Sequence, residues 1–242
     1  MLWLKGWLET RWRMAFVLFV SVFLLSVPLQ ILRDAPVAVR PRLLPTLLGS
    51  MGLLLACITA ISLAGSGIQT ALTRPGRSEK SGEESTVFTL SLPVTRARLF
   101  AVRTLIGVLE TVALLTLFAV IVWLFVPAIL VNAGGGLGCF AAIVACSLAA
   151  YAISACLSTF CDEGWRFRLS MLIMLVLFFL GAGAQRQGLA RSAALPPSID
   201  IFRLVAVPLS TRQIPWVTII AACGVAVLSL AAAVTIIQRR DY

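Results

Sequence analysis

The sequence predicts an all-α polytopic membrane protein with six transmembrane helices, an N-terminal interfacial helix and both termini in the cytoplasm. Of its 242 residues 60% are hydrophobic and 12% are charged, whereas a soluble globular domain has about 45–50% apolar and about 25% charged residues. Six apolar runs approach the length that crosses a bilayer. The basic residues gather at the ends of these runs, where they anchor helices and set orientation.

The six predicted spans share a length near the roughly 20 residues that a helical crossing needs. They cover residues 14–32, 43–68, 104–126, 137–160, 165–184 and 214–237. The fifth run is the shortest, and it reaches this length only if it begins near Trp165. None of the runs alternates with the period of a barrel strand, and backbone groups in lipid need hydrogen bonds within their own segment, so each run is expected to be helical.

Residues 1–13 are predicted to form a helix that lies in the plane of the membrane interface. Trp3 and Trp7 fall on one side of such a helix, and Lys5 and Arg13 fall largely on the other, which is typical of interfacial helices. The alternative is that this stretch simply flanks the first span and that its tryptophans are ordinary belt residues. A cleaved signal peptide is not expected, because the following apolar run is too long and further spans come after it.

The distribution of Lys and Arg predicts the orientation of a single transmembrane domain. With both termini inside, the cytoplasmic segments hold most of the 20 basic residues, as the positive-inside rule requires. Residues 69–103 then form the main cytoplasmic segment, and a short turn joins the fourth and fifth spans. Residues 126–136 form a Gly-rich outer turn, and residues 185–213 form a longer extracytoplasmic segment.

Small residues at four-residue spacing indicate where the spans touch, because helices in lipid associate through close backbone approach. Such residues occur in the second, fourth and sixth spans. They are Ala56, Ala60 and Ala64; Ala141, Ala145 and Ala149; and Gly224 with Ala221 and residues 231–233. The apolar fifth span lacks them and is expected to face lipid. Six such helices show no polar lumen, so a second copy or a related partner is expected to complete any path.

The composition excludes several kinds of chemistry for this chain on its own. The sequence has no histidine, which removes the usual acid–base residue and the commonest zinc ligand. Its six cysteines lie within or beside apolar runs without metal-binding spacing, so no metal site is expected. The chain lacks the GxxxxGK[ST] phosphate loop and therefore is not an ATPase. The basic residues form no stripe that would favour nucleic acid.

Glu110 is the one acidic residue inside a predicted span. Acidic residues within the membrane mark candidate functional sites, because burying an unpaired charge is costly. One hypothesis is that Glu110 lines the transport path for a cationic substrate. The alternative is a carboxylate at the level of the lipid headgroups, compensated by a nearby arginine.

The longest polar-to-amphipathic interruption between spans is residues 83–103, EESTVFTLSLPVTRARLFAVR. Lipid selects against such charge, whereas a soluble partner at the membrane surface would favour it. The phrase GEESTVFTLSLPVTR resembles the first cytoplasmic loop of ABC-2 type permeases, the membrane subunits of ATP-driven exporters. In that family acidic residues lead into a short coupling helix, followed by a phrase like LSLPV[ST]R and the third span. The resemblance in sequence covers some 20 residues, and the remaining likeness is one of architecture.

This resemblance implies a coupling helix near residues 84–92 that would bind a groove of a cytoplasmic ABC ATPase, with a second and weaker contact at the turn before the fifth span. The implied coupling residues are Glu83, Glu84, Val87, Phe88, Leu90, Leu92, Pro93, Arg96, Asp162 and Glu163. Apolar side chains framed by charges can both anchor and orient such a contact. The structural alternative is a solvated loop whose charges only fix topology.

The function expected from this resemblance is a permease subunit in the inner (cell) membrane that works as a homodimer or heterodimer. The chain itself would bind no cofactor, since ATP and Mg²⁺ would bind the partner subunit. Two alternatives remain, namely an intramembrane lipid-modifying enzyme and a non-transporting membrane scaffold. The substrate is not indicated, although an apolar interior fits a lipid, a hydrophobic drug or a peptide.

Overall fold

The structure, a computed structural model, describes residues 11, 14–23, 26, 30, 52–64, 96–125, 133–161, 163–186 and 216–239. Within these ranges the chain is all-helical, and none of the described residues belongs to a strand. The predicted all-α class is therefore confirmed for this part of the chain. The interfacial helix predicted for residues 1–13 and most of the coupling segment lie outside the described residues.

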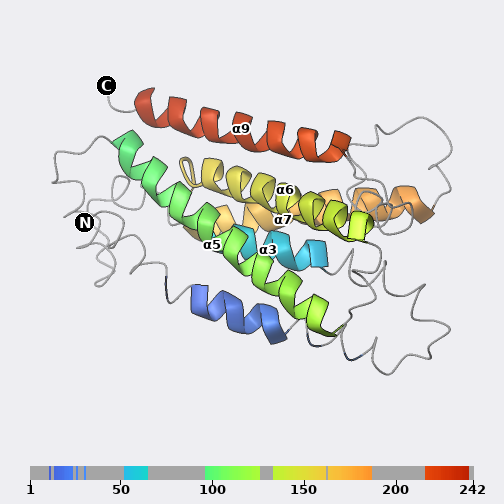
Figure 1. Ribbon diagram of the computed structural model, residues 1–242. Coiled ribbons are helices and arrows are strands. Elements are labelled where there is room, and N and C mark those ends of the chain that lie inside the picture. The colour runs from blue at the N-terminus through green and yellow to red at the C-terminus, as the bar shows by residue number, and fades with distance from the viewer. Residues whose placement is uncertain are drawn as a thin grey trace.

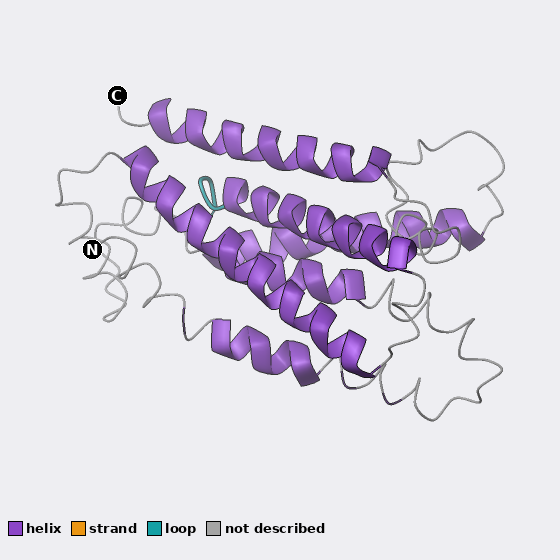
Figure 2. Ribbon diagram, in the orientation of Figure 1, coloured by secondary structure: helices purple, strands orange, loops and turns teal. Residues whose placement is uncertain are grey.

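Six helices make up the described part of the bundle (Figure 1). An N-terminal helix covers Met14–Phe23. The others are α3 (Gly52–Leu63), α5 (Arg96–Phe125), α6 (Ala133–Leu157), α7 (Glu163–Arg186) and α9 (Trp216–Arg239). A short turn over residues 158–161 follows α6, drawn in teal in Figure 2.

Three of the described helices are long and apolar enough to cross a membrane. These segments are Phe100–Leu124, Phe140–Leu157 and Ile219–Arg239, which match the 17–25 residues that a transmembrane helix usually needs. They lie within the third, fourth and sixth predicted spans. The Met14–Phe23 and Gly52–Leu63 helices are apolar but shorter. The chain is thus a membrane protein by the length and composition of its helices.

Two of the predicted span boundaries are wrong, in both cases because the helix begins earlier. The third predicted span starts at Thr104, but α5 begins at Arg96, so the last eight residues of the expected coupling segment are helical. The outer turn was expected to reach Gly136, but α6 begins at Ala133 and includes the glycines. Glycine is tolerated in helices of membrane proteins, because a helix satisfies every backbone group internally. The fourth span also ends early, since residues 158–160 form a turn.

Successive helices run in opposite directions, so their ends gather at the two ends of the bundle. In Figure 1 the starts of α5 and α7 and the ends of α3, α6 and α9 lie toward the left. This end, which we call the basic end, holds the arginines near the start of α5, the start of α7 and the end of α9. They are Arg96, Arg98, Arg103, Arg166, Arg168 and Arg239. Among the described residues of the opposite end, Arg186 is the only basic one.

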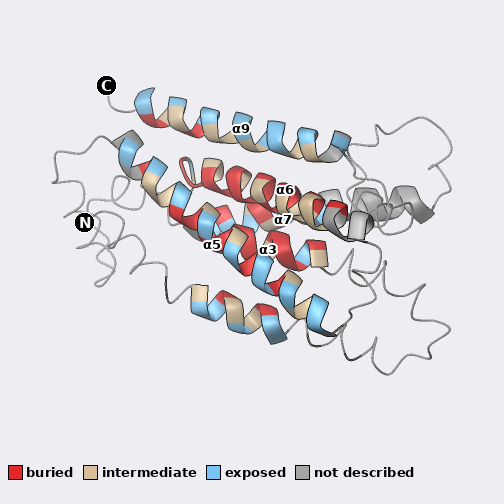
Figure 3. Ribbon diagram, viewed as in Figure 1, coloured by how far each residue is buried: buried red, intermediate tan, exposed pale blue. Residues whose placement is uncertain are grey.

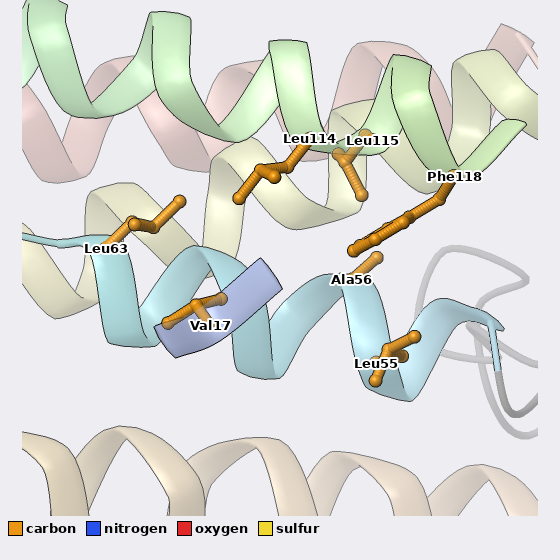
Figure 4. Packing of buried hydrophobic residues seen from close by; sticks show 7 residues of the cluster. All are labelled: Val17, Leu55, Ala56, Leu63, Leu114, Leu115 and Phe118. Carbon is orange, nitrogen blue, oxygen red and sulfur yellow. The ribbon is translucent and has the colours of Figure 1, made fainter. Parts of the chain in front are cut away.

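The core of the bundle forms where α3, α5 and α6 meet, and it consists of aliphatic and small side chains. One cluster joins the N-terminal helix, α3 and α5 (Figure 4). Its buried members are Val17, Leu55, Ala56, Leu63, Leu114, Leu115 and Phe118. Ser21 and Thr59 add a buried hydrogen bond of 3.2 Å between the N-terminal helix and α3. Such close contact is the main force that holds helices together in lipid.

The predicted contact faces are confirmed for α3 and only in part for α9. Ala56, Ala60 and Ala64 are all buried. On α9, Ala233 is fully buried, whereas Gly224 is exposed and a Cβ added there would meet nothing within 4 Å. Small residues are therefore necessary for close approach without being sufficient, because the same spacing occurs on a face that no described helix covers.

Candidate functional site

The predicted coupling residues fall almost entirely outside the described part of the chain. This holds for Glu83, Glu84, Val87, Phe88, Leu90, Leu92, Pro93 and Asp162. Arg96 is the first residue of α5, and Glu163 is the first residue of α7. Both helices therefore start where the two predicted cytoplasmic contacts end.

Glu110 lies on α5 and faces the interior of the bundle, with 6% of its surface exposed. It comes ten residues after Phe100, where the apolar span of α5 begins. At 1.5 Å per residue it lies about 15 Å along the helix from that point, close to half of a hydrocarbon core of about 30 Å. The carboxylate is therefore deeper than a position at the headgroups, the alternative considered from sequence.

Tyr151 on α6 is the largest fully buried side chain, and it packs into a notch on α5. Its hydroxyl donates a hydrogen bond of 3.3 Å to the backbone carbonyl of Thr104. The notch exists because residue 107 is glycine. A Cβ at Gly107 would collide with the Tyr151 hydroxyl and would lie 2.9 Å from two ring carbons. The absence of a side chain at Gly107 thus allows α5 and α6 to approach closely.

Two charged side chains converge on this tyrosine from different helices. Glu110 on α5 and Arg166 on α7 both interact electrostatically with the Tyr151 hydroxyl, and Arg166 is 2% exposed. We call Thr104, Gly107, Glu110, Tyr151 and Arg166 the Tyr151 cluster. Opposite charges and a hydroxyl close together reduce the cost of burying each charge, as is usual for ionisable groups within membrane proteins.

Tyr151 also belongs to a polar stripe that follows one face of α6. Ser147, Tyr151, Ser154 and Ser158 recur at intervals of four, three and four residues, which places them on one side of a helix. All four are 3% exposed or less. We call these four residues the α6 polar stripe. It runs from the middle of α6 to the turn at the basic end.

Most hydroxyl groups in the described helices donate to a carbonyl of their own helix. Ser147 donates to Ile143 at 2.7 Å, Thr111 to Gly107 at 2.7 Å and Ser158 to Ala155 at 2.6 Å. This bond to the previous turn satisfies a hydroxyl in an apolar environment. Ser154 on α6 and Ser170 on α7 differ, because their buried hydroxyls have no hydrogen-bond partner among the described residues.

Three of the cysteines come from different helices but form no metal site. Cys57 on α3 interacts electrostatically with Cys146 on α6, and Cys146 interacts with Cys223 on α9. These thiols are free. In the described residues no group of three or more His, Cys, Asp or Glu side chains could hold a metal ion.

The sequence analysis identified Glu110 but missed Tyr151, Ser154, Arg166 and Ser170. The α6 polar stripe could have been found from its spacing, since Ser147, Tyr151, Ser154 and Ser158 follow a helical period. Arg166 was counted only as a topology signal, because it lies three residues after the start of α7. That it points into the bundle depends on how α7 rotates against α6. What was expected to be an interior without polar groups contains a connected polar region.

No family model, curated protein or solved structure matches this chain.

Proposed function

We propose that this chain is the permease subunit of an ATP-driven ABC exporter, with the ATP and Mg²⁺ bound by a separate cytoplasmic ATPase. Two copies, or this chain and a related permease, form the path in the cell membrane, which is the inner membrane where two are present. The proposal rests on the resemblance of residues 83–96 to the coupling loop of ABC-2 permeases. The all-helical, apolar bundle is compatible with it.

The observation that supports this proposal best is the continuity of α5. The coupling phrase leads directly to Arg96, where α5 begins, and the helix then continues for 30 residues. The same helix carries Glu110 and the notch that receives Tyr151. A movement imposed on the start of α5 by an ATPase would therefore reach the buried polar groups through a single rigid element. Such a movement would shift the population between inward-open and outward-open states.

The orientation that fits this function places the basic end in the cytoplasm. Six described arginines lie near that end and one lies at the other. The positive-inside rule places such an excess on the cytoplasmic side. The coupling segment, which precedes α5, and the turn that follows α6 then both face the ATPase.

The test is whether an ABC ATPase co-purifies with the tagged protein and whether Phe88→Asp abolishes that association. A charge placed on the apolar anchor of the coupling helix should reduce the recovered ATPase by about tenfold or more, because hot-spot side chains contribute at least about 2 kcal/mol. The control is Ser78→Asp, which adds the same charge to the same segment outside the resembling phrase. Equal recovery of the ATPase with both variants would contradict the proposed docking.

The Tyr151 cluster also gives some support to the alternative of an intramembrane lipid-modifying enzyme. A buried carboxylate, phenol and guanidinium within interaction range are groups that could handle a polar headgroup. The two functions differ in their energy source. A permease requires the ATPase for transport and its substrate should stimulate ATP hydrolysis, whereas an enzyme would convert lipid in vesicles that contain this chain alone.

A further inference from the structure

Ser154 and Ser170 are exceptions among the buried hydroxyl groups of the bundle. Ser154 is 0% exposed and Ser170 is 2% exposed, yet neither hydroxyl has a hydrogen-bond partner among the described residues. A carbonyl one turn earlier is available to a helical serine, and Ser147 on the same stripe uses it. The two exceptional hydroxyls are therefore directed elsewhere.

The two serines lie on either side of the Tyr151 cluster. α6 and α7 are antiparallel and are joined by residues 158–162, so residues equally far from this turn lie at the same level. Ser154 is three residues before the end of α6, and Arg166 is three residues after the start of α7. Tyr151 and Ser170 are six and seven residues from those same helix ends. The seam between α6 and α7 thus carries polar groups over about 10 Å of its length, at 1.5 Å per residue.

An unsatisfied hydroxyl buried in this way costs about 1–3 kcal/mol. Two such groups at neighbouring levels are unexpected unless something else accepts or donates a hydrogen bond there. Bound water is the usual partner of otherwise unsatisfied buried groups, and it needs between two and four polar neighbours. The hydroxyls of Ser154, Ser158 and Ser170 and the guanidinium of Arg166 provide that number of neighbours.

We propose that the α6–α7 seam, defined as Ser154, Ser158, Arg166 and Ser170, is a water-accessible path from the basic end to Glu110. Glu110 contacts the same Tyr151 hydroxyl region as Arg166, so the hydrated path reaches about halfway across the bilayer. Water in this seam connects the solution at the basic end to the buried carboxylate. The inference depends on the geometry of the described helices and requires neither the ATPase nor the resemblance to permeases.

The experiment measures how fast a thiol in the seam reacts with membrane-impermeant reagents. Ser154→Cys and Ser170→Cys are reconstituted in vesicles and treated from one face at a time with sulfonatoethyl or trimethylammonioethyl methanethiosulfonate. Peptide mass spectrometry reads the labelled positions, so the native cysteines can remain. Labelling should occur from the face that carries the basic end, because only a hydrated thiol ionises and reacts.

The matched controls are Ala155→Cys on α6 and Leu172→Cys on α7. Ala155 is one residue closer to the basic end than Ser154, but it packs in the apolar cluster with Ala60 and Ala233. Leu172 is on the exposed surface of α7. Depth alone would make Ala155→Cys react faster than Ser154→Cys. A hydrated seam instead makes it react about tenfold more slowly or less, since each unit by which burial raises a thiol pKa removes about nine-tenths of the thiolate.

Two outcomes would overturn the proposal. The first is that Ser154→Cys and Ser170→Cys stay unlabelled from the basic end, although denatured protein is labelled at both positions. The second is labelling from the opposite face alone. Neither outcome depends on whether an ATPase binds, so the seam and the proposed transport function can fail separately.

Discussion

α6 and α9 are helices of 25 and 24 residues with similarly apolar sequences, yet their surroundings differ. α6 contacts α3, α5, α7 and α9 and lies at the centre of the bundle. Along most of α6 the side chains are buried or half-buried, whereas α9 exposes most of its large aliphatic residues, as Figure 3 shows in red and blue. Ile220, Val227 and Leu228 on α9 are each more than 60% exposed.

The difference shows what burial means for a helix in lipid. Exposed leucine and valine on α9 cost nothing, because lipid tails are as apolar as the protein interior. α6 is central because its alanines and serines permit close approach on several sides. It also carries the Tyr151 cluster, which lipid would not tolerate. Hydrophobicity therefore identifies both helices as spans, but small and polar residues distinguish the central helix from the peripheral one.

The largest expected effect breaks the charge balance beside α6. Arg166→Leu removes a cation from the Tyr151 cluster and leaves Glu110 with less compensation, which should lower the free energy of unfolding by about 3–5 kcal/mol. The measurement is the thermal unfolding midpoint in detergent. Adding Glu110→Gln to Arg166→Leu should restore part of the loss, since no buried charge is then left uncompensated.

Arg168→Leu is the control for this charge effect, because Arg168 is exposed on the same helix. Its guanidinium lies 5.7 Å from the centroid of the Trp165 ring, and an exposed contact of this kind contributes about 0.5–1 kcal/mol. Equal losses for Arg166→Leu and Arg168→Leu would show that the buried charges do not contribute to stability.

An intermediate effect is expected from filling the notch that brings α5 and α6 together. Gly107→Leu places a side chain where the Tyr151 ring lies, and overpacking of this kind costs about 1–3 kcal/mol. Gly224→Leu on α9 is the counterpart, because a Cβ there meets open space, and its midpoint should hardly change. If the two variants unfold at the same temperature, close packing at Gly107 is not what joins α5 and α6.

The smallest effect is expected on the outer face of α9. Leu228 is 71% exposed, so Leu228→Ala opens no internal cavity and should change stability by less than about 0.5 kcal/mol. The same truncation at Leu114, which is 1% exposed in the core of the bundle, is the positive control for the unfolding measurement. A loss at Leu228 as large as that at Leu114 would indicate that another surface covers α9 in the assembled protein.

Prediction from sequence succeeded where composition and local spacing suffice. The helical class follows from the apolar runs, and the burial of Ala56, Ala60 and Ala64 follows from their four-residue spacing. The helix starts at Arg96 and Ala133 were missed, because charged residues and glycines were interpreted as loop. Gly224 was assigned to a contact that the described helices do not make, since spacing alone does not state which of several similar faces a partner covers.

The amino-acid sequence alone determined that this chain enters a membrane as helices, because a long apolar segment can satisfy its backbone there in few other ways. It also placed Glu110 within such a segment. The rotation and pairing of the helices, which no local pattern specifies, decided the rest. They brought Tyr151 into the space left by Gly107, turned Arg166 inward toward the same hydroxyl, and left one face of α9 exposed. Contacts between residues that are distant in sequence depend on side-chain shape across helix surfaces, and only the tertiary structure contains that information.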